Sequence, residues 1–199
     1  MTAPVEVWFE FASTYSYPAV MRVEREAAAR GVPVIWRPFL LGPVFAAQGL
    51  TDSPFNLNPV KGAYMWRDLE RVCTAQGLPF RRPSRFPRGS LLATRIAFAY
   101  ADAPWVGDFI RAVFQASFGE DVEIGQSEVI GAILAGLGQD AETVFARAAE
   151  PAVKSGLRAQ TEAALGHGIF GAPSFRVGDE LFWGNDRLDA AMDWAVRSP

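Results

Sequence analysis

The chain has 199 residues, half of them apolar, with a formal charge of −3 and an isoelectric point near 5.3, which predicts a globular protein with a substantial core. The acidic balance argues against a general nucleic-acid binder, and the apolar runs are too short to span a membrane. A single cysteine, Cys73, excludes an intrachain disulfide, and no secretory leader is visible, so we expect a cytoplasmic protein.

The N-terminal part of the chain predicts a strand, a helix and a second strand. Val5–Phe11 is short and rich in aromatic and β-branched residues, which indicates a buried strand. A helical pattern of apolar residues follows over Tyr17–Arg30, and Gly31 is placed to end it. Val34–Leu40 predicts a second strand, with Pro38 near its end or on a sheet edge. We expect this β-α-β unit to be parallel and right-handed.

The middle of the chain changes character and becomes mostly helical. Gly, Pro, Asn and Asp are frequent between Pro43 and Pro59, which predicts a loop with one short helix. Pro59 opens a strong helix that runs to about Gln76, and a connector rich in proline and arginine follows over residues 81–89. Further helical segments are expected at 90–101, 104–118, 127–137, 140–149 and 151–166.

The last thirty residues return to β structure. Ser174–Val177 and Glu180–Trp183 flank a Gly-Asp pair and predict a hairpin, and a helix is expected over Asp186–Arg197. The order β-α-β, helices, β-β-α predicts an α/β protein with a thioredoxin-like fold and a large helical insertion. We expect residues 1–42 and 168–199 to form one discontinuous domain, and residues 43–167 to form the insertion.

The first candidate site is the sequence Ser13-Thr14-Tyr15-Ser16, between the first strand and the first helix. Strand, S-x-x-S, helix is the layout of a thioredoxin-type C-x-x-C site with both sulfurs replaced by hydroxyls. Such a site cannot exchange disulfides, but it can bind the thiol of a ligand, and glutathione is the first candidate. Ser13 would donate to a thiolate that the helix start also stabilises. The alternative is that Ser13 or Ser16 caps the helix, and for Ser16 we favour the cap.

The second candidate site is Gly171-Ala172-Pro173-Ser174, immediately before a predicted strand. It resembles the segment that faces the C-x-x-C turn in the thioredoxin fold, so we expect the Ala172–Pro173 bond to be cis. The backbone of Ala172 would then pair with the cysteinyl part of a peptide-like ligand. An ordinary Gly/Pro turn is the alternative.

Several polar residues have both a functional and a structural interpretation. Asn185 and Asp186 can accept from the ammonium group of a γ-glutamyl ligand, or they can simply cap the last helix. Four arginines at positions 81, 82, 85 and 88 can bind an anionic substrate, or they can form a solvated basic loop; Lys61 is similarly ambiguous. A single histidine argues against a triad or a metal site, and Cys73 fits a core position.

Together these pieces resemble the 2-hydroxychromene-2-carboxylate isomerase family, which is related to kappa-class glutathione transferases and to DsbA-type proteins. The resemblance covers nearly the whole chain. It is carried by F-E-F-A-S-T-Y-S-Y at 9–17, N-P-V-K-G-A-Y-M-W-R-D-L-E-R at 58–71, G-L-P-F at 77–80, F-G-A-P-S-F at 170–175 and F-W-G-N-D-R-L at 182–188. One departure is Thr14, where relatives commonly have proline.

The resemblance implies a glutathione-dependent isomerase that converts 2-hydroxychromene-2-carboxylate-type acids to trans-o-hydroxybenzylidenepyruvates during aromatic degradation. It implies a catalytic Ser13 and glutathione contacts from Ala172, Pro173, Asn185, Asp186 and Asn56. Substrate contacts are implied for Lys61, Phe86 and Pro87, and Arg88 is a further candidate. It also implies a homodimer with no metal.

Two other functions are compatible with the same residues. A kappa-like glutathione transferase or peroxidase acting on small electrophiles would use the same thiolate site but would consume glutathione. A redox-inactive binding module would show no turnover. Disulfide exchange is disfavoured, because a lone Cys73 outside the turn cannot run dithiol chemistry.

Overall fold

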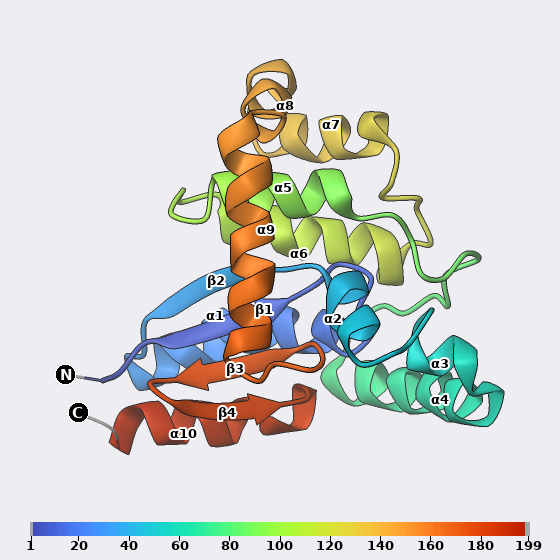
Figure 1. The fold of residues 1–199 in the computed structure, drawn as a ribbon, viewed down its shortest axis with the longest axis vertical. Helices are drawn as coiled ribbons and strands as arrows, with labels where there is room; N and C mark the ends of the chain where they lie inside the picture. Colours follow the sequence, from blue (N-terminus) through green and yellow to red (C-terminus); the bar gives the residue numbers. More distant parts are fainter. Residues whose placement is uncertain (1, 198–199) are drawn as a thin grey trace.

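The computed structural model describes residues 2–197 and contains a four-stranded sheet in the order β2-β1-β3-β4 (Figure 1). Strand β1 (Val5–Phe9) pairs in parallel with β2 (Val34–Pro38). Strand β3 (Ser174–Val177) runs antiparallel to β1, and β4 (Glu180–Trp183) runs antiparallel to β3. The parallel first unit, the C-terminal hairpin and the edge position of β2 are therefore as the sequence predicted.

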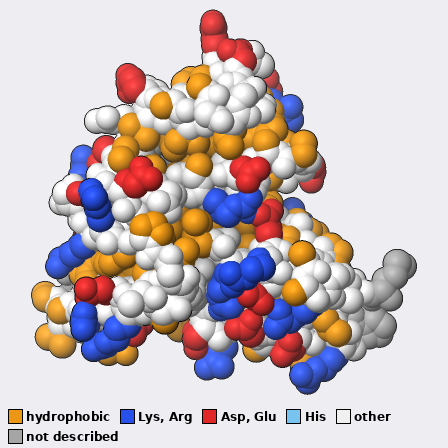
Figure 2. All heavy atoms as spheres, turned by 180° about the vertical axis from the view of Figure 1, so that it is seen from behind, with side chains coloured by type: hydrophobic (Ala, Val, Ile, Leu, Met, Phe, Trp, Pro, Cys, Tyr) orange, Lys and Arg blue, Asp and Glu red, His pale blue; other side chains and the backbone are white. Residues whose placement is uncertain are grey.

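Two helices, α1 (Ser16–Arg30) and α10 (Leu188–Arg197), pack against each other and against the sheet. Gly31 ends α1 in the left-handed conformation with φ +63°, as expected of a C-terminal glycine. The outer surfaces of the two helices are charged, and the Arg22 guanidinium bridges them by an ion pair with Asp189 at 3.0 Å. Figure 2 shows Lys, Arg, Asp and Glu side chains gathered on the lower part of this face of the molecule.

The chain between β2 and β3 is helical: in Figure 1, α5 to α8 lie above the sheet, α9 passes in front of it, and α3 and α4 lie at the lower right. Helices α2 and α3 both form where one short helix was predicted, and α4 has the bounds expected. The elements are α2 (Leu41–Ala47), α3 (Pro54–Leu57), α4 (Pro59–Gln76), α5 (Leu91–Ala99), α6 (Val106–Phe114), the π-helical turn η1 (Gln115–Gly119), α7 (Ser127–Gly136), α8 (Ala141–Ala148) and α9 (Pro151–Gly166). The proposed boundaries at residues 42 and 168 stay a prediction.

A continuous aromatic core joins the sheet to these helices. Phe9 and Phe11 pack edge to face with ring centroids 5.3 Å apart, and Phe114 lies 5.1 Å from Phe11. Tyr17 stacks on Phe118 at 5.7 Å, so the start of α1 is anchored in the same cluster. Because the backbone next to the candidate turn is held from both sides by buried rings, the turn has a rigid base.

Several predicted ends are wrong by two residues or more, including those of the segments expected at 90–101 and 104–118, whose α-helices cover Leu91–Ala99 and Val106–Phe114. Strand β1 stops at Phe9 and β2 at Pro38, because the chain turns there toward α1 and α2. The last helix was expected from Asp186, but Asn185–Arg187 forms a 3₁₀ turn, η2, and the α-helix begins at Leu188. Within the described residues, no helix is long and apolar enough to cross a membrane.

Candidate functional site

A cavity of about 1010 Å³ opens between the end of β1, the helices α2 to α4 and the segment before β3. Its volume is at the upper end of the range for small-molecule sites. The wall includes the nominated residues Ser13, Lys61, Phe86, Pro87, Arg88, Ala172, Asn185 and Asp186, but not Pro173, Asn56 or the three other arginines of the connector, Arg81, Arg82 and Arg85. Distant parts of the chain therefore meet around one space.

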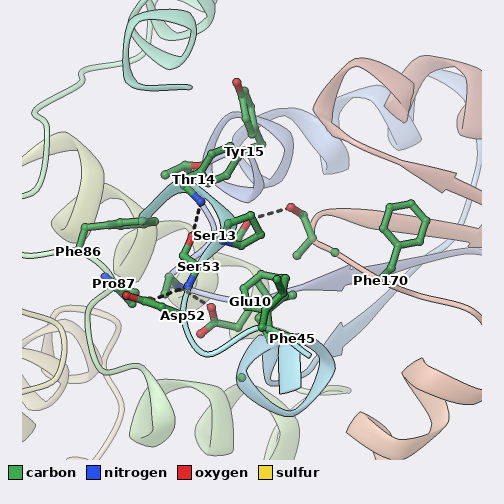
Figure 3. A pocket seen from close by; sticks show the side chains of 18 of the residues that line it. Glu10, Ser13, Thr14, Tyr15, Phe45, Asp52, Ser53, Phe86, Pro87 and Phe170 are labelled. Atoms are coloured by element: carbon green, nitrogen blue, oxygen red, sulfur yellow. Dashed lines mark hydrogen bonds between the residues drawn. The ribbon is translucent and has the colours of Figure 1, made fainter. Parts of the chain in front are cut away.

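Ser13 lies in the turn after β1, and its hydroxyl has two partners. The Oγ donates to the backbone carbonyl of Ala172 at 2.9 Å, shown as a dashed line in Figure 3, and it accepts from the N–H of Ser16 at 3.3 Å. The Ser13 N–H is held by the carbonyl of Glu10 at 2.9 Å. Since the Ser16 N–H occupies the acceptor side of Oγ, the hydroxyl proton points across the turn toward the segment before β3.

The expectation that Ser16 caps α1 is wrong. Tyr15 precedes the helix, Ser16 is its first residue, and Ser13 supplies the hydroxyl that accepts from the helix start. The Oγ of Ser16 is buried and has no hydrogen-bond partner among residues 2–197. Ser13 thus combines the capping contact with its position on the cavity wall, two roles that the sequence could not separate.

The segment opposite Ser13 has the geometry that the sequence predicted. The Ala172–Pro173 peptide bond is cis, and the carbonyl of Pro173 accepts from the N–H of Gly184 at 2.9 Å. A side chain at Gly171 would meet the indole nitrogen of Trp183 at 2.6 Å, so this wall has room only for glycine. Ala172 lines the cavity beside this glycine, and its carbonyl accepts the Ser13 hydroxyl.

Asn185 and Asp186 line the same cavity at the start of η2. Asn185 is 8% exposed, and its side-chain Oδ1 has no partner within the described part of the chain. Its backbone carbonyl accepts from Arg22 at 2.7 Å, which fixes the residue in place. The Asp186 side chain is exposed. A buried amide oxygen without a partner is an acceptor that a ligand donor can satisfy.

The carboxyl group of Glu10 is a component of the site that the sequence interpretation missed. It lines the cavity but is only 6% exposed, and it accepts from the Ala12 N–H at 3.1 Å and from the hydroxyl of Ser90. Burial raises the pKa of Glu10 to about 7, against the lowering effect of these two hydrogen bonds. The available signal was a carboxylate set between two apolar aromatic residues, Phe9 and Phe11, at the end of a buried strand.

The far wall carries the residues nominated for substrate contact. Lys61 lines the cavity with its ammonium 6.0 Å from the ring centroid of Phe55. The Phe86–Pro87 bond is also cis, which the sequence did not predict, and both residues line the cavity. Asn56 is exposed outside the lining, and its amide donates to Asp52 at 3.0 Å.

Arg88 lines the cavity, but it is too buried to belong to a solvated basic loop, and the substrate contact expected of it stays a prediction. Its side chain is 3% exposed, and it forms an ion pair with Asp121. It also donates to the backbone carbonyl of Ser117 at 2.8 Å and lies 3.7 Å from the carboxylate of Glu123. These contacts hold the connector that carries Phe86 and Pro87 against the helical region, while the Nε of Arg88 has no hydrogen-bond partner among residues 2–197.

The cavity combines an apolar chamber with a few polar groups. Tyr15 donates to Asp68 at 2.9 Å, and burial together with that carboxylate raises the pKa of the phenol. The apolar lining comes from Leu40, Leu41, Pro43, Phe45, Leu50, Phe55, Leu91 and Phe170. Such a chamber suits a flat aromatic molecule, while the turn at Ser13 suits a group that accepts hydrogen bonds.

The chain supplies neither a reactive thiol nor an obvious metal site to this cavity. Cys73 is buried on α4, and burial raises the pKa of its thiol to about 12. Within residues 2–197, no three His, Cys, Asp or Glu side chains lie close enough together to hold a metal ion.

Comparison with known proteins agrees with this geometry. The profile of the family described as "DSBA-like thioredoxin domain" matches residues 4–193. The 2-hydroxychromene-2-carboxylate isomerase of Pseudomonas putida is 28% identical over 185 residues, covering 92% of this chain and 90% of the relative. Human glutathione S-transferase kappa 1 is 28% identical over 199 residues, covering 93% and 87%.

A solved 2-hydroxychromene-2-carboxylate isomerase superposes with a TM-score of 0.86 at 28% identity, covering 97% of this chain and 94% of that structure. The thioredoxin-like fold and the family resemblance expected from the sequence are confirmed.

Proposed function

We propose that this chain, which belongs to the family of DSBA-like thioredoxin domains, is a glutathione-dependent isomerase. Its substrates would be 2-hydroxychromene-2-carboxylate-type aromatic acids, and its products trans-o-hydroxybenzylidenepyruvates. Relatives that carry the isomerase name, at 28% identity over nine-tenths of the chain, support this proposal. The observation that carries it is the Ser13 hydroxyl on the cavity wall, where a disulfide oxidoreductase would carry a cysteine.

The residues around Ser13 fit glutathione. When bound, glutathione would supply a thiolate that adds to the conjugated substrate, allows the former double bond to rotate, and leaves. Ser13 would redirect its proton from the Ala172 carbonyl to the sulfur, while the Ser16 N–H keeps the hydroxyl oriented. Loss of the Ser13 contact frees the Ala172 backbone to pair with the cysteinyl unit.

The other end of glutathione would lie near η2. The unpartnered Oδ1 of Asn185 and the exposed carboxylate of Asp186 would accept from the γ-glutamyl ammonium. Pro173 would shape this strand-like segment without touching the ligand. Asn56 does not line the cavity, so glutathione would have to extend beyond the cavity edge to make the contact proposed for this residue.

The substrate would occupy the apolar chamber. Phe86 and Pro87 would contact its aromatic rings, and Lys61 would pair with its carboxylate. Arg88 would act by holding the connector in place.

A kappa-like glutathione transferase or peroxidase is the second candidate. Kappa-class glutathione transferases of Caenorhabditis elegans, 26% identical, and of humans, 28% identical, favour it. An isomerase regenerates glutathione in every cycle, whereas a transferase consumes it. A free-thiol assay during turnover of a benzylidenepyruvate-type acid distinguishes the two.

The test of the thiol site is a pair of variants, Ser13→Ala and Ser16→Ala. Ser13→Ala removes a charge-assisted hydrogen bond worth roughly 1.5–3 kcal/mol, so the rate near neutral pH should fall by about one to two decades. Ser16→Ala removes a buried hydroxyl that has no partner among residues 2–197, so activity and stability should be kept. pH–rate profiles, melting curves and calorimetry with glutathione measure these effects. If Ser13→Ala keeps full activity and its pH–rate profile does not shift, then Ser13 only caps α1 and does not act on the thiol.

The expectation of a cytoplasmic homodimer stays a prediction. Light scattering on the purified chain tests the assembly, and fractionation of the host cell tests the compartment.

A further inference from the structure

Glu10 is a buried carboxyl group in the cavity wall that the proposed chemistry does not use. The rings of Phe9 and Phe11 on either side of it are both buried in the core, and the Glu10 side chain lines the cavity instead. Its backbone carbonyl holds the Ser13 N–H at 2.9 Å, and its carboxylate holds the Ala12 N–H at 3.1 Å. Figure 3 shows Glu10 below the Ser13 turn, beside the pocket. Glu10 thus fixes the turn through two bonds.

The carboxyl group has no cationic partner. Among the described residues, its contacts are the Ala12 N–H and the Ser90 hydroxyl, and it appears in no ion pair. The nearest arginine in sequence to Ser90 is Arg88, which is turned toward Asp121 and Glu123. The other titratable groups that line the cavity are Tyr15, Asp52, Lys61, Tyr64, Asp68, Arg88 and Asp186. Burial therefore dominates, and it raises the pKa of Glu10 to about 7.

A second anion in this cavity would interact unfavourably with the ionised form of Glu10. Two negative charges that share one cavity do not ionise independently when one of them is buried, and the proton of one group is retained by the other. The thiolate expected at Ser13 would be that second anion, since Ser13 and Glu10 line the same cavity three residues apart. The titration of one group must then depend on the other, and this coupling is reciprocal.

We propose that Glu10 positions the Ser13 turn and takes up the proton that the thiol of bound glutathione releases. In this step the S–H bond breaks, the electron pair stays on sulfur, and an O–H bond forms on the Glu10 carboxylate. The cavity keeps its net charge, which avoids placing two anions in it. The inference rests on the proposed function, because it requires a thiol bound at Ser13. Direct contact between carboxyl and sulfur is not needed, since groups facing an open cavity exchange protons through solvent.

The experiment is calorimetry of glutathione binding at pH 7 in buffers of different ionisation enthalpy, which counts the protons released. With a pKa of about 7, Glu10 is about half ionised at this pH, so it can absorb about half a proton per bound thiolate. Glu10→Gln cannot absorb it and should release up to about half a proton more than the unmodified chain. Glu6→Gln is the matched control on β1, the strand that leads to Glu10, and its proton count should not change, because Glu6 pairs with Arg37 and Arg176 outside the cavity lining.

A second variant, Ser90→Ala, tests the same proposal even if the Glu10→Gln variant fails to fold. Ser90→Ala removes a hydrogen bond that favours ionised Glu10, so proton uptake on binding should move to higher pH. A merely structural Glu10 predicts equal proton counts in all variants and an unmoved pH dependence in Ser90→Ala, and either result overturns the inference. Absence of glutathione binding to the unmodified chain overturns the proposed function itself, which separates the two failures.

Discussion

The ionisation of Glu10 should make the stability of the fold depend on pH in a defined window. Folding raises the pKa of this carboxyl from its ordinary value of 4.5 to about 7, chiefly by burial. In the unfolded chain the group ionises as the pH rises through 4.5, while in the folded chain it stays protonated until about pH 7. The unfolded state binds fewer protons in this window, so stability falls with rising pH. Each pKa unit corresponds to about 1.4 kcal/mol, so the loss amounts to roughly 3 kcal/mol.

Glu10→Gln should abolish that slope. The amide cannot ionise, and replacing one oxygen by an NH₂ group disturbs either the Ala12 or the Ser90 contact. The disturbance lowers stability by an amount that does not depend on pH. The free energy of unfolding of the variant minus that of the unmodified chain should therefore rise by roughly 3 kcal/mol between pH 4.5 and 7 and then level off.

Urea unfolding at a series of pH values, followed by circular dichroism, measures this difference. Glu6→Gln provides a control with the opposite sign. Burial tends to raise the pKa of Glu6, but Arg37 and Arg176 outweigh it and hold the pKa below its ordinary value. Glu6 therefore stabilises the fold above pH 4.5 and loses that contribution in more acidic solution. A Glu10→Gln difference that stays flat between pH 4.5 and 7 would refute a protonated, buried Glu10.

Other perturbations test the walls of the cavity. Arg88→Met should keep the packing of the side-chain stem but remove its bonds to Ser117 and Asp121. We expect denaturation to show a loss of about 1–3 kcal/mol in the free energy of unfolding, and inhibitor-binding assays to show a weaker affinity for the aromatic acid. Gly62→Ala would place a methyl group 2.3 Å from the backbone oxygen of Phe55, so α3 must shift and the melting temperature should fall. Gly136→Ala, which has open space around it, is the matched control and should melt at the same temperature or higher.

Most of the helices and strands could be predicted from the sequence, because prolines and glycines mark their ends clearly. Pro59 and Gly77 bracket α4, and the Gly178-Asp179 pair sets the β3–β4 hairpin, so those elements have the bounds expected. The ends of the strands were harder to predict from the sequence. Phe11 is as apolar as Phe9, but it belongs to the core packing after β1 rather than to the strand.

The candidate site was predicted only where a motif marks it. Ser13, Ala172 and Asn185 lie in short patterns whose order along the chain indicates their meeting. Glu10 and Arg88 could not be interpreted in this way, because their roles depend on burial and on partners far away in sequence, such as Ser90 for Glu10 and Asp121 for Arg88. A charged residue is expected at the surface by default, and only the three-dimensional packing shows otherwise.

The two walls of the cavity come from separate stretches of the chain, and this has a consequence for how the protein can diversify. The wall around Ser13 and Ala172 lies next to the ends of strands β1 and β3, whereas the opposite wall belongs to α2 through α4 and the connector. The ion pair of Arg88 with Asp121 holds this connector against the helical region. The Tyr15–Asp68 hydrogen bond joins the two walls. Recombination that exchanges residues 41–91 between homologues while keeping Asp68 would transplant substrate preference as a unit. Under the proposed function, the substrate preference would then change while the thiol site around Ser13 stays the same.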